Sequence, residues 1–230
     1  AFAALKAGAS VVAWGCKDFG GDCSQVQEQL VSDVQHIYAS EKAFAALKAD
    51  SVIAWGDQQS QAKAVSEPLG KLQENGVVQN IFRNNKAGAA LTKNGSVFTW
   101  GSPNAGGDCS SVQPQLVDVQ SVYCTPTAFR AVKVDGSVVA WGDQDRGGKC
   151  STVQEQLAAD VQSIYSTKEA FAALKADGSV VAWGNGNEGG DCSMVQHQLG
   201  DVQSIYSTDY AFAALKADGG VVAWGHGYWG

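Results

Sequence analysis

The residues that could carry out chemistry do not combine into a recognisable active site. The three histidines, His36, His197 and His226, occupy unrelated positions in the repeating pattern described below. A metal site usually contains ligand pairs such as Cys-x-x-Cys, and the sequence has none. Four serines recur directly after a cysteine, where a hydroxyl more often caps a turn than acts as a nucleophile. They are Ser24, Ser110, Ser151 and Ser193. We therefore predict that the chain is no enzyme, with no catalytic residue, no metal and no cofactor.

The six cysteines look like a disulfide framework until they are placed on the repeat. Four of them follow a repeated tryptophan by nine residues: Cys23, Cys109, Cys150 and Cys192. Equivalent positions in successive repeats point the same way and are usually too far apart to bridge. We predict small buried residues at these positions. A Cys16–Cys23 disulfide within one loop remains an alternative.

One stretch recurs six times and organises the chain. Its fullest form is Ala-Phe-Ala-Ala-Leu-Lys-Ala-Asp-Gly-Ser-Val-Val-Ala-Trp-Gly, at residues 170–184. The copies end near Gly15, Gly56, Gly101, Gly142, Gly184 and Gly225, which gives a repeat of about 41 to 45 residues. A fixed period of this size indicates an array of supersecondary units.

Each repeat predicts three strands. The Ala-Phe-Ala-Ala-Leu-Lys run and the Ser-Val-Val-Ala-Trp-Gly run flank an Asp-Gly turn, which is typical of a β-hairpin. A polar glycine-rich loop follows, and then a Val-Gln-x-Gln-Leu connector, which is too short for a stable free helix. Asp-Val-Gln-Ser-Ile-Tyr-Ser, as at residues 201–207, predicts a third strand with a bulge.

Three-stranded units must stack to bury both faces. We predict an all-β fold, a β-propeller of about six short three-stranded blades that forms a single domain over residues 1–230. The first blade is incomplete, because the first copy starts at Ala1. The missing strand either is absent from a closed ring or lies outside this chain. An open solenoid is the alternative architecture.

The formal net charge of −7 argues against nucleic acid or an anionic membrane surface as the partner. No apolar run approaches the roughly 18 residues of a membrane span, so we expect a soluble protein. The compartment is unknown.

The strands are nearly copied from repeat to repeat, whereas the residues two to five after each Trp vary. A constant scaffold with varied loops is expected when function resides on the loops, although exposed loops also drift freely. We predict a partner-binding surface that includes twelve of these loop residues. They are Lys17, Asp18, Phe19, Gln58, Gln59, Asn104, Asp145, Arg146, Asn187, Glu188, Tyr228 and Trp229.

A second varied set precedes the hairpins, and we expect it on the opposite face. It consists of Glu41-Lys42, Asn85-Lys86, Pro126-Thr127, Lys168-Glu169 and Asp209-Tyr210.

The loops after the tryptophans are acidic as a group. Residues two to eight after each Trp include eight acidic and four basic residues, a net charge of −4. We therefore expect a protein partner with a neutral or basic surface. Phe19, Tyr228 and Trp229 are aromatic residues outside the repeated positions and are the expected anchors. For Trp229, docking of the terminus against the first blade is an equal alternative.

The order of these segments resembles the repeat of the regulator-of-chromosome-condensation family. The match covers the polar glycine loop, the Val-to-Leu connector, the third strand and the hairpin ending in Trp-Gly, in all six copies. That family folds as a propeller. Its larger members often have a histidine before the Ala-Leu strand, where this chain has phenylalanine, as at Phe171 and Phe212.

The short repeat is similar to that of the bacterial β-lactamase-inhibitory propeller, a compact binding protein. The near-verbatim copies are also similar to repeat arrays in predicted proteins of dinoflagellate algae, a source that would allow an organellar complex. We expect a non-enzymatic protein-binding scaffold, and a peripheral subunit of a multi-subunit complex is one form of that hypothesis. The family resemblance implies an alternative, guanine-nucleotide exchange on a small GTPase. A sugar-binding propeller is a third hypothesis.

Overall fold

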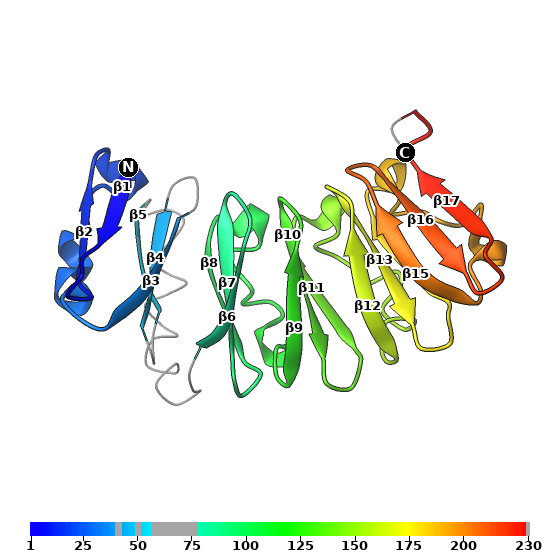
Figure 1. Ribbon diagram of the computed structural model, residues 1–230, viewed down its shortest axis with the longest axis horizontal. Helices are drawn as coiled ribbons and strands as arrows, with labels where there is room; N and C mark the ends of the chain where they lie inside the picture. Colours follow the sequence, from blue (N-terminus) through cyan, green and yellow to red (C-terminus); the bar gives the residue numbers. More distant parts are fainter. Residues whose placement is uncertain (40–42, 49–51, 57–77, 229–230) are drawn as a thin grey trace. The chain divides into compact units, whose positions relative to one another are not determined.

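The computed structural model describes residues 1–39, 43–48, 52–56 and 78–228 (Figure 1). The chain divides into two compact units, Ala1–Asp118 and Val119–Gly230, which are described separately. Both units consist of small antiparallel sheets joined by loops and short 3₁₀ turns. The predicted all-β array of short blades is confirmed in each unit. The prediction of a single domain stays a prediction.

The first unit contains three sheets, and the first of them has two strands where the others have three. Its strands are β1 (Phe2–Leu5) and β2 (Val11–Trp14); β3 (Val34–Ala39), β4 (Ala43–Lys48) and β5 (Val52–Gly56); and β6 (Val78–Arg83), β7 (Ala87–Thr92) and β8 (Val97–Gly101). The incomplete first blade is therefore confirmed.

The second unit contains three three-stranded sheets. Its strands are β9 (Val119–Cys124), β10 (Ala128–Lys133) and β11 (Val138–Gly142); β12 (Val161–Ser166), β13 (Ala170–Lys175) and β14 (Val180–Gly184); and β15 (Val202–Ser207), β16 (Ala211–Lys216) and β17 (Val221–Gly225). In each three-stranded sheet the middle strand belongs to the predicted hairpin and also pairs with the predicted third strand.

The expected bulge is present in the predicted third strand of each three-stranded sheet. In β12 the register shifts between Val161 and Ser163, so Gln162 is the extra residue. Without a bulge, residues three apart in a strand would point to opposite faces. The shift lets Val161 and Ile164 both be buried, as they are.

The Asp-Gly turns connect successive repeats as well as reversing the chain. Gly178 has a φ of +77°, a conformation that favours glycine. A Cβ atom there would lie 3.1 Å from Asp201 Cα of the next repeat. The Val202 backbone N–H, at the start of β15, donates to the Gly178 carbonyl at 3.0 Å. The turn glycine thus places the first strand of the following sheet.

The recurring cysteines are buried, as predicted, and each also forms a hydrogen bond with a recurring glutamine. The Cys192 thiol donates to Gln196 Oε1 at 3.0 Å, and Gln196 Nε2 donates to the Val180 carbonyl at 3.2 Å. The same arrangement occurs at Cys23–Gln27–Val11, Cys109–Gln113–Val97 and Cys150–Gln154–Val138. We call it the Cys–Gln clamp. Through these hydrogen bonds it holds the connector against the start of the last strand of the hairpin.

Three of the four connectors are short 3₁₀ segments, in agreement with the prediction that the connectors are too short for a stable helix. They are η2 (Ser24–Leu30), η4 (Gln113–Gln115) and η7 (Gln196–Gln198). The leucine that ends the connector is buried in four repeats: Leu30, Leu116, Leu157 and Leu199. Cys16 and Cys23 are both free thiols, so the alternative Cys16–Cys23 disulfide is not formed.

Candidate binding surface

Four of the loops that follow the tryptophans form one-turn 3₁₀ segments. They are η1 (Lys17–Phe19), η3 (Pro103–Ala105), η5 (Gln144–Arg146) and η6 (Gly186–Glu188). In η5 and η6 the residue before the turn caps it, because Asp143 accepts from the Asp145 N–H and Asn185 accepts from the Asn187 N–H. Local hydrogen bonds therefore hold the variable residues in a defined conformation.

The scaffold of the next repeat anchors the end of each loop. Gly189, which ends η6, has a φ of +95°, and a Cβ atom there would lie 2.6 Å from the Phe212 ring. The Trp224 indole N–H donates to the Gly189 carbonyl at 3.0 Å. Phe212 and Trp224 stack with their ring centroids 5.2 Å apart.

The same contact recurs in both units. Trp183 donates to the Gly147 carbonyl at 3.2 Å, and Trp55 donates to the Gly20 carbonyl at 3.0 Å. The repeated Phe–Trp pair is therefore a support for the variable loop of the preceding repeat.

The second varied set lies on the same face as the first, so the expected opposite face is wrong. The Asn185 N–H donates to the Glu169 carbonyl at 2.9 Å, and the His226 N–H donates to the Tyr210 carbonyl at 3.1 Å. The physical reason is the antiparallel hairpin, which brings the start of its first strand and the end of its second strand together. Ala170 accordingly pairs with Gly184.

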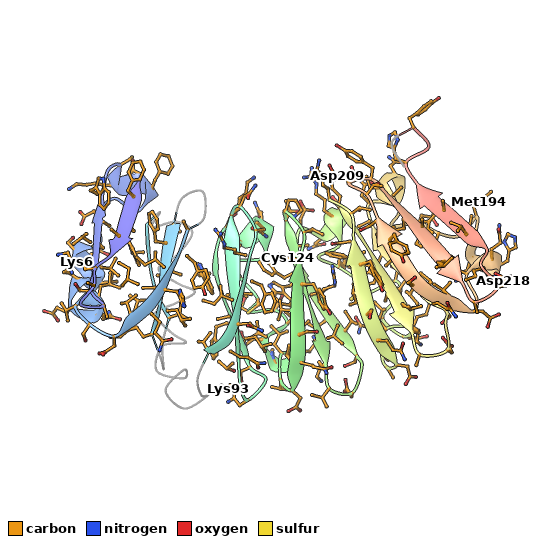
Figure 2. The ribbon with its side chains drawn as sticks, viewed as in Figure 1. Lys6, Lys93, Cys124, Met194, Asp209 and Asp218 are labelled. Atoms are coloured by element: carbon orange, nitrogen blue, oxygen red, sulfur yellow. The ribbon has the colours of Figure 1, made fainter. Side chains whose placement is uncertain are left out.

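We call this face, formed by the loops before and after each hairpin, the rim. Figure 2 shows Asp209 at the rim end of the β15–β17 sheet and Asp218, in the hairpin turn, at the opposite end. Glu41 and Lys42 of the second varied set lie outside the described residues.

Charged side chains from three repeats meet on the rim of the second unit. Arg146 Nη1 lies 3.1 Å from Glu169 Oε1, and Asn185 Nδ2 donates to Glu169 Oε2 at 2.8 Å. Lys168 Nζ lies 2.8 Å from Asp209 Oδ2 and donates to the Tyr210 hydroxyl at 3.3 Å. These bonds join successive repeats through their variable residues.

Glu188 adds a further carboxylate to this cluster. Its Oε2 atom is buried and accepts no hydrogen bond from the described residues. Burial, followed by the neighbouring Glu169 carboxylate, raises the pKa of Glu188 above its usual value. The rim therefore contains one carboxylate whose ionised form is poorly compensated.

A groove of about 1180 Å³ lies in the second unit between the loops that follow β11 and β14. Trp183 and Gly184 of β14 are among its lining residues. Its charged lining consists of Asp143, Asp145, Glu169, Asp191, Arg146 and Lys149. Arg146 is paired with Glu169 and lies 3.8 Å from Asp143, so its charge is largely neutralised. The groove is therefore polar and net acidic.

The predicted site residues are distributed over both units. Lys17, Asp18, Phe19 and Asn104 are exposed on the first unit, and Asp145, Arg146, Asn187 and Tyr228 are exposed on the second, where Glu188 is half-buried. Asp145 and Arg146 line the groove. Tyr228 is 92% exposed. Gln58, Gln59 and Trp229 lie outside the described residues.

Sequence reasoning missed four residues that the structure places with the predicted site. Lys168, Glu169, Asp209 and Tyr210 belong to the second varied set and were assigned to the wrong face. Hairpin register was the signal that could have found them, because it requires both loops at one end of the sheet.

Within the described residues, no group of three or more His, Cys, Asp or Glu side chains could hold a metal ion. The helical segments described are all too short and too polar to cross a membrane.

No protein-family model and no curated protein matches the chain. Among solved structures, it is similar to Prp20p from Saccharomyces cerevisiae, with 17% identity and a TM-score of 0.49 over 92% of this chain and 65% of that one. Human WBSCR16 matches with 17% identity and a TM-score of 0.48 over 84% of this chain and 61% of that one. The ectodomain of the Arabidopsis thaliana receptor kinase ACR4 matches with 15% identity and a TM-score of 0.45 over 97% of this chain and 79% of that one.

The chain thus spans less than two thirds of the length of Prp20p or WBSCR16. Prp20p is described as yeast RCC1. At these identities the similarity concerns the fold alone.

Proposed function

We propose that the chain is a non-enzymatic protein-binding module that contacts its partner through the rim. The groove of the second unit carries this proposal, because residues that vary between repeats line a cavity built on strands that do not vary. A polar cleft supported by a rigid scaffold is typical of a binding site whose specificity resides in its loops.

The charges of the groove define the partner further. Four carboxylates face two basic groups, and one of these, Arg146, is already paired. A neutral or basic segment of a protein fits this lining better than an acidic one, because complementary charge speeds association and disfavours wrong partners. The exposed ring of Tyr228, on the same unit, is available as an aromatic anchor. A peripheral place in a larger assembly is consistent with such a module.

Site-specific photo-crosslinking tests the proposal directly. A photoreactive amino acid at Gln144, in the groove lining, should capture a discrete partner from a native extract. The matched control is Val134, which is 74% exposed but lies in the hairpin turn at the other end of its sheet. Equal capture from both positions would contradict the proposal.

A charge reversal then tests the role of the acidic lining. Asp145→Lys should weaken capture, whereas Asp135→Lys, which changes an exposed carboxylate in the hairpin turn, should leave it unchanged. The same purified protein should neither accelerate nucleotide release from a small GTPase nor bind simple sugars. Either activity would favour the corresponding alternative.

A further inference from the structure

Arg130 is an exception within the copied scaffold. It lies in β10, at a position that is alanine in the middle strand of the other described three-stranded sheets. Those residues are Ala45, Ala89, Ala172 and Ala213. A long cation therefore stands in one repeat where the other repeats have a methyl group, which is buried at Ala45, Ala89 and Ala172.

The Arg130 side chain is enclosed between two sheets of the second unit. It is 1% exposed, and its Cζ atom lies 3.6 Å from the centre of the Phe171 ring in β13 and 5.0 Å from that of Tyr123 in β9. Nε and Nη1 donate to no acceptor among the described residues. The Phe171 ring covers one face of the guanidinium. The unused N–H groups lie in the plane of the guanidinium and point away from its edge.

The position is energetically unfavourable as it stands. Burial lowers the pKa of the Arg130 guanidinium well below its usual range, and interactions with Tyr123 and Cys124 oppose that shift only in part. A guanidinium does not lose its proton in a protein, so the buried positive charge persists. Aromatic rings offset some of the cost of burying this charge. A buried charge is normally paired, and among the described residues no carboxylate forms an ion pair with Arg130.

We propose that Arg130 binds a small anion, a halide or a carboxylate group, between the β9–β11 and β12–β14 sheets. The anion would accept hydrogen bonds from the guanidinium edge while Phe171 stays stacked on its face. Such in-plane acceptance is how carboxylates and other anions pair with arginine. The site goes beyond the proposed protein-binding function, because it consists of strand residues and not of rim loops. Its ligand would stabilise the packing of the two sheets.

Thermal unfolding tests this site. The melting temperature is measured at constant ionic strength while sodium gluconate, whose anion is large, is replaced by sodium chloride or sodium formate. An anion that binds only the folded state should raise the melting temperature by about 5–10 °C at a hundredfold excess over its dissociation constant. A response to chloride supports a halide site, a response to formate supports a carboxylate site, and a response to neither overturns the proposal.

Two variants make the test specific. Arg130→Met keeps much of the side-chain volume and removes the charge, so it should lose the anion response. Arg83→Met makes the same change at an exposed arginine and should respond as the unsubstituted protein does. An equal response in Arg130→Met would overturn the proposal.

Bromide gives an independent measurement on the unsubstituted protein if Arg130→Met does not fold. Crystals grown in sodium bromide should show an anomalous scattering peak within about 3.5 Å of Arg130 Nε or Nη1. A clear electron-density map without a peak there would contradict halide binding. Crystals grown in sodium formate would then test carboxylate binding at the same atoms.

Discussion

At the scale of single residues, the variable loops depend on a few positions that cannot vary. Gly189 illustrates this, because its positive φ and its contact with Phe212 both exclude a side chain. Gly186, three residues earlier in the same loop, has no such constraint, since a Cβ atom there would first meet Asp191 at an ordinary 3.5 Å. Two glycines in one loop thus have different roles.

We expect Gly189→Ala to destabilise the protein by about 1–3 kcal/mol, because the new methyl group would displace the Phe212 ring and strain the backbone. Gly186→Ala should change the free energy of unfolding by less than about 0.5 kcal/mol. Urea unfolding monitored by tryptophan fluorescence measures both. Similar effects for the two variants would contradict the assigned role of Gly189.

Glu188 leads to a pH-dependent prediction. Its pKa is raised in the folded state, so the folded protein binds this proton more tightly than the unfolded chain does. The contribution of Glu188 to stability is therefore favourable at low pH and is lost as the pH rises through the folded-state pKa. Neighbouring charges that act on it are Glu169, Lys168, Arg146 and His226.

Glu188→Gln should accordingly raise the melting temperature at pH 7, and the gain should shrink as the pH is lowered towards 4. The comparison with the unsubstituted protein at each pH removes the general effect of acid. Carboxylates with lowered pKa values, such as Asp177 and Asp191, cause part of that general effect in both proteins. A gain that grows on acidification would show that the assigned sign is wrong.

At the scale of elements, the Cys–Gln clamp explains why two polar-looking positions are copied with the strands. The glutamine amide bridges a buried thiol and a strand carbonyl, so it satisfies a main-chain acceptor at the point where the connector crosses the sheet. The Val-Gln-x-Gln-Leu motif is thus explained by packing. Its first glutamine makes the polar contact with the strand, and its leucine is buried and makes the apolar contact.

Gln196→Ala should cost about 1 kcal/mol of stability, since it leaves the Val180 carbonyl without its side-chain donor. Gln198→Ala, in the same connector but outside the clamp, should cost little. Hydrogen exchange of the amides in β14 gives a second measurement, and it should quicken only in the first variant. Equal costs for the two substitutions would argue against the clamp.

At the scale of the whole molecule, the cysteines allow several repeats in both units to be probed separately. Cys16 is exposed, whereas Cys23, Cys109, Cys150 and Cys192 are buried. Burial also raises the pKa of the last three thiols, which lowers their reactive thiolate fraction at neutral pH.

Labelling of the native protein with a thiol reagent should therefore modify Cys16 first. The four clamp cysteines should react only as fast as their repeats open, and all of them should react readily in denaturant. Peptide mass spectrometry at successive times assigns each rate. Rapid labelling of Cys192 under native conditions would contradict the clamp in that repeat.

Much of this architecture could be predicted from local pattern. The Asp-Gly turns, the β-branched return strands and the Val-to-Ile spacing of the third strand predict the hairpins, the strand count and the bulge, because these depend on residues close together in the chain. The burial of the recurring cysteines could be predicted from periodicity. Their glutamine partners could not, because that hydrogen bond depends on how the connector crosses the strand edge.

The sequence by itself determined the repeat, the three strands of each blade and the contrast between copied strands and varied loops. Only the tertiary structure decided that both varied sets share one rim, that a groove opens between the loops of adjacent sheets, and that Arg130 is buried against Phe171. These features join residues from different strands or different repeats. Their distances depend on the packing of sheets, which leaves no local pattern in the sequence.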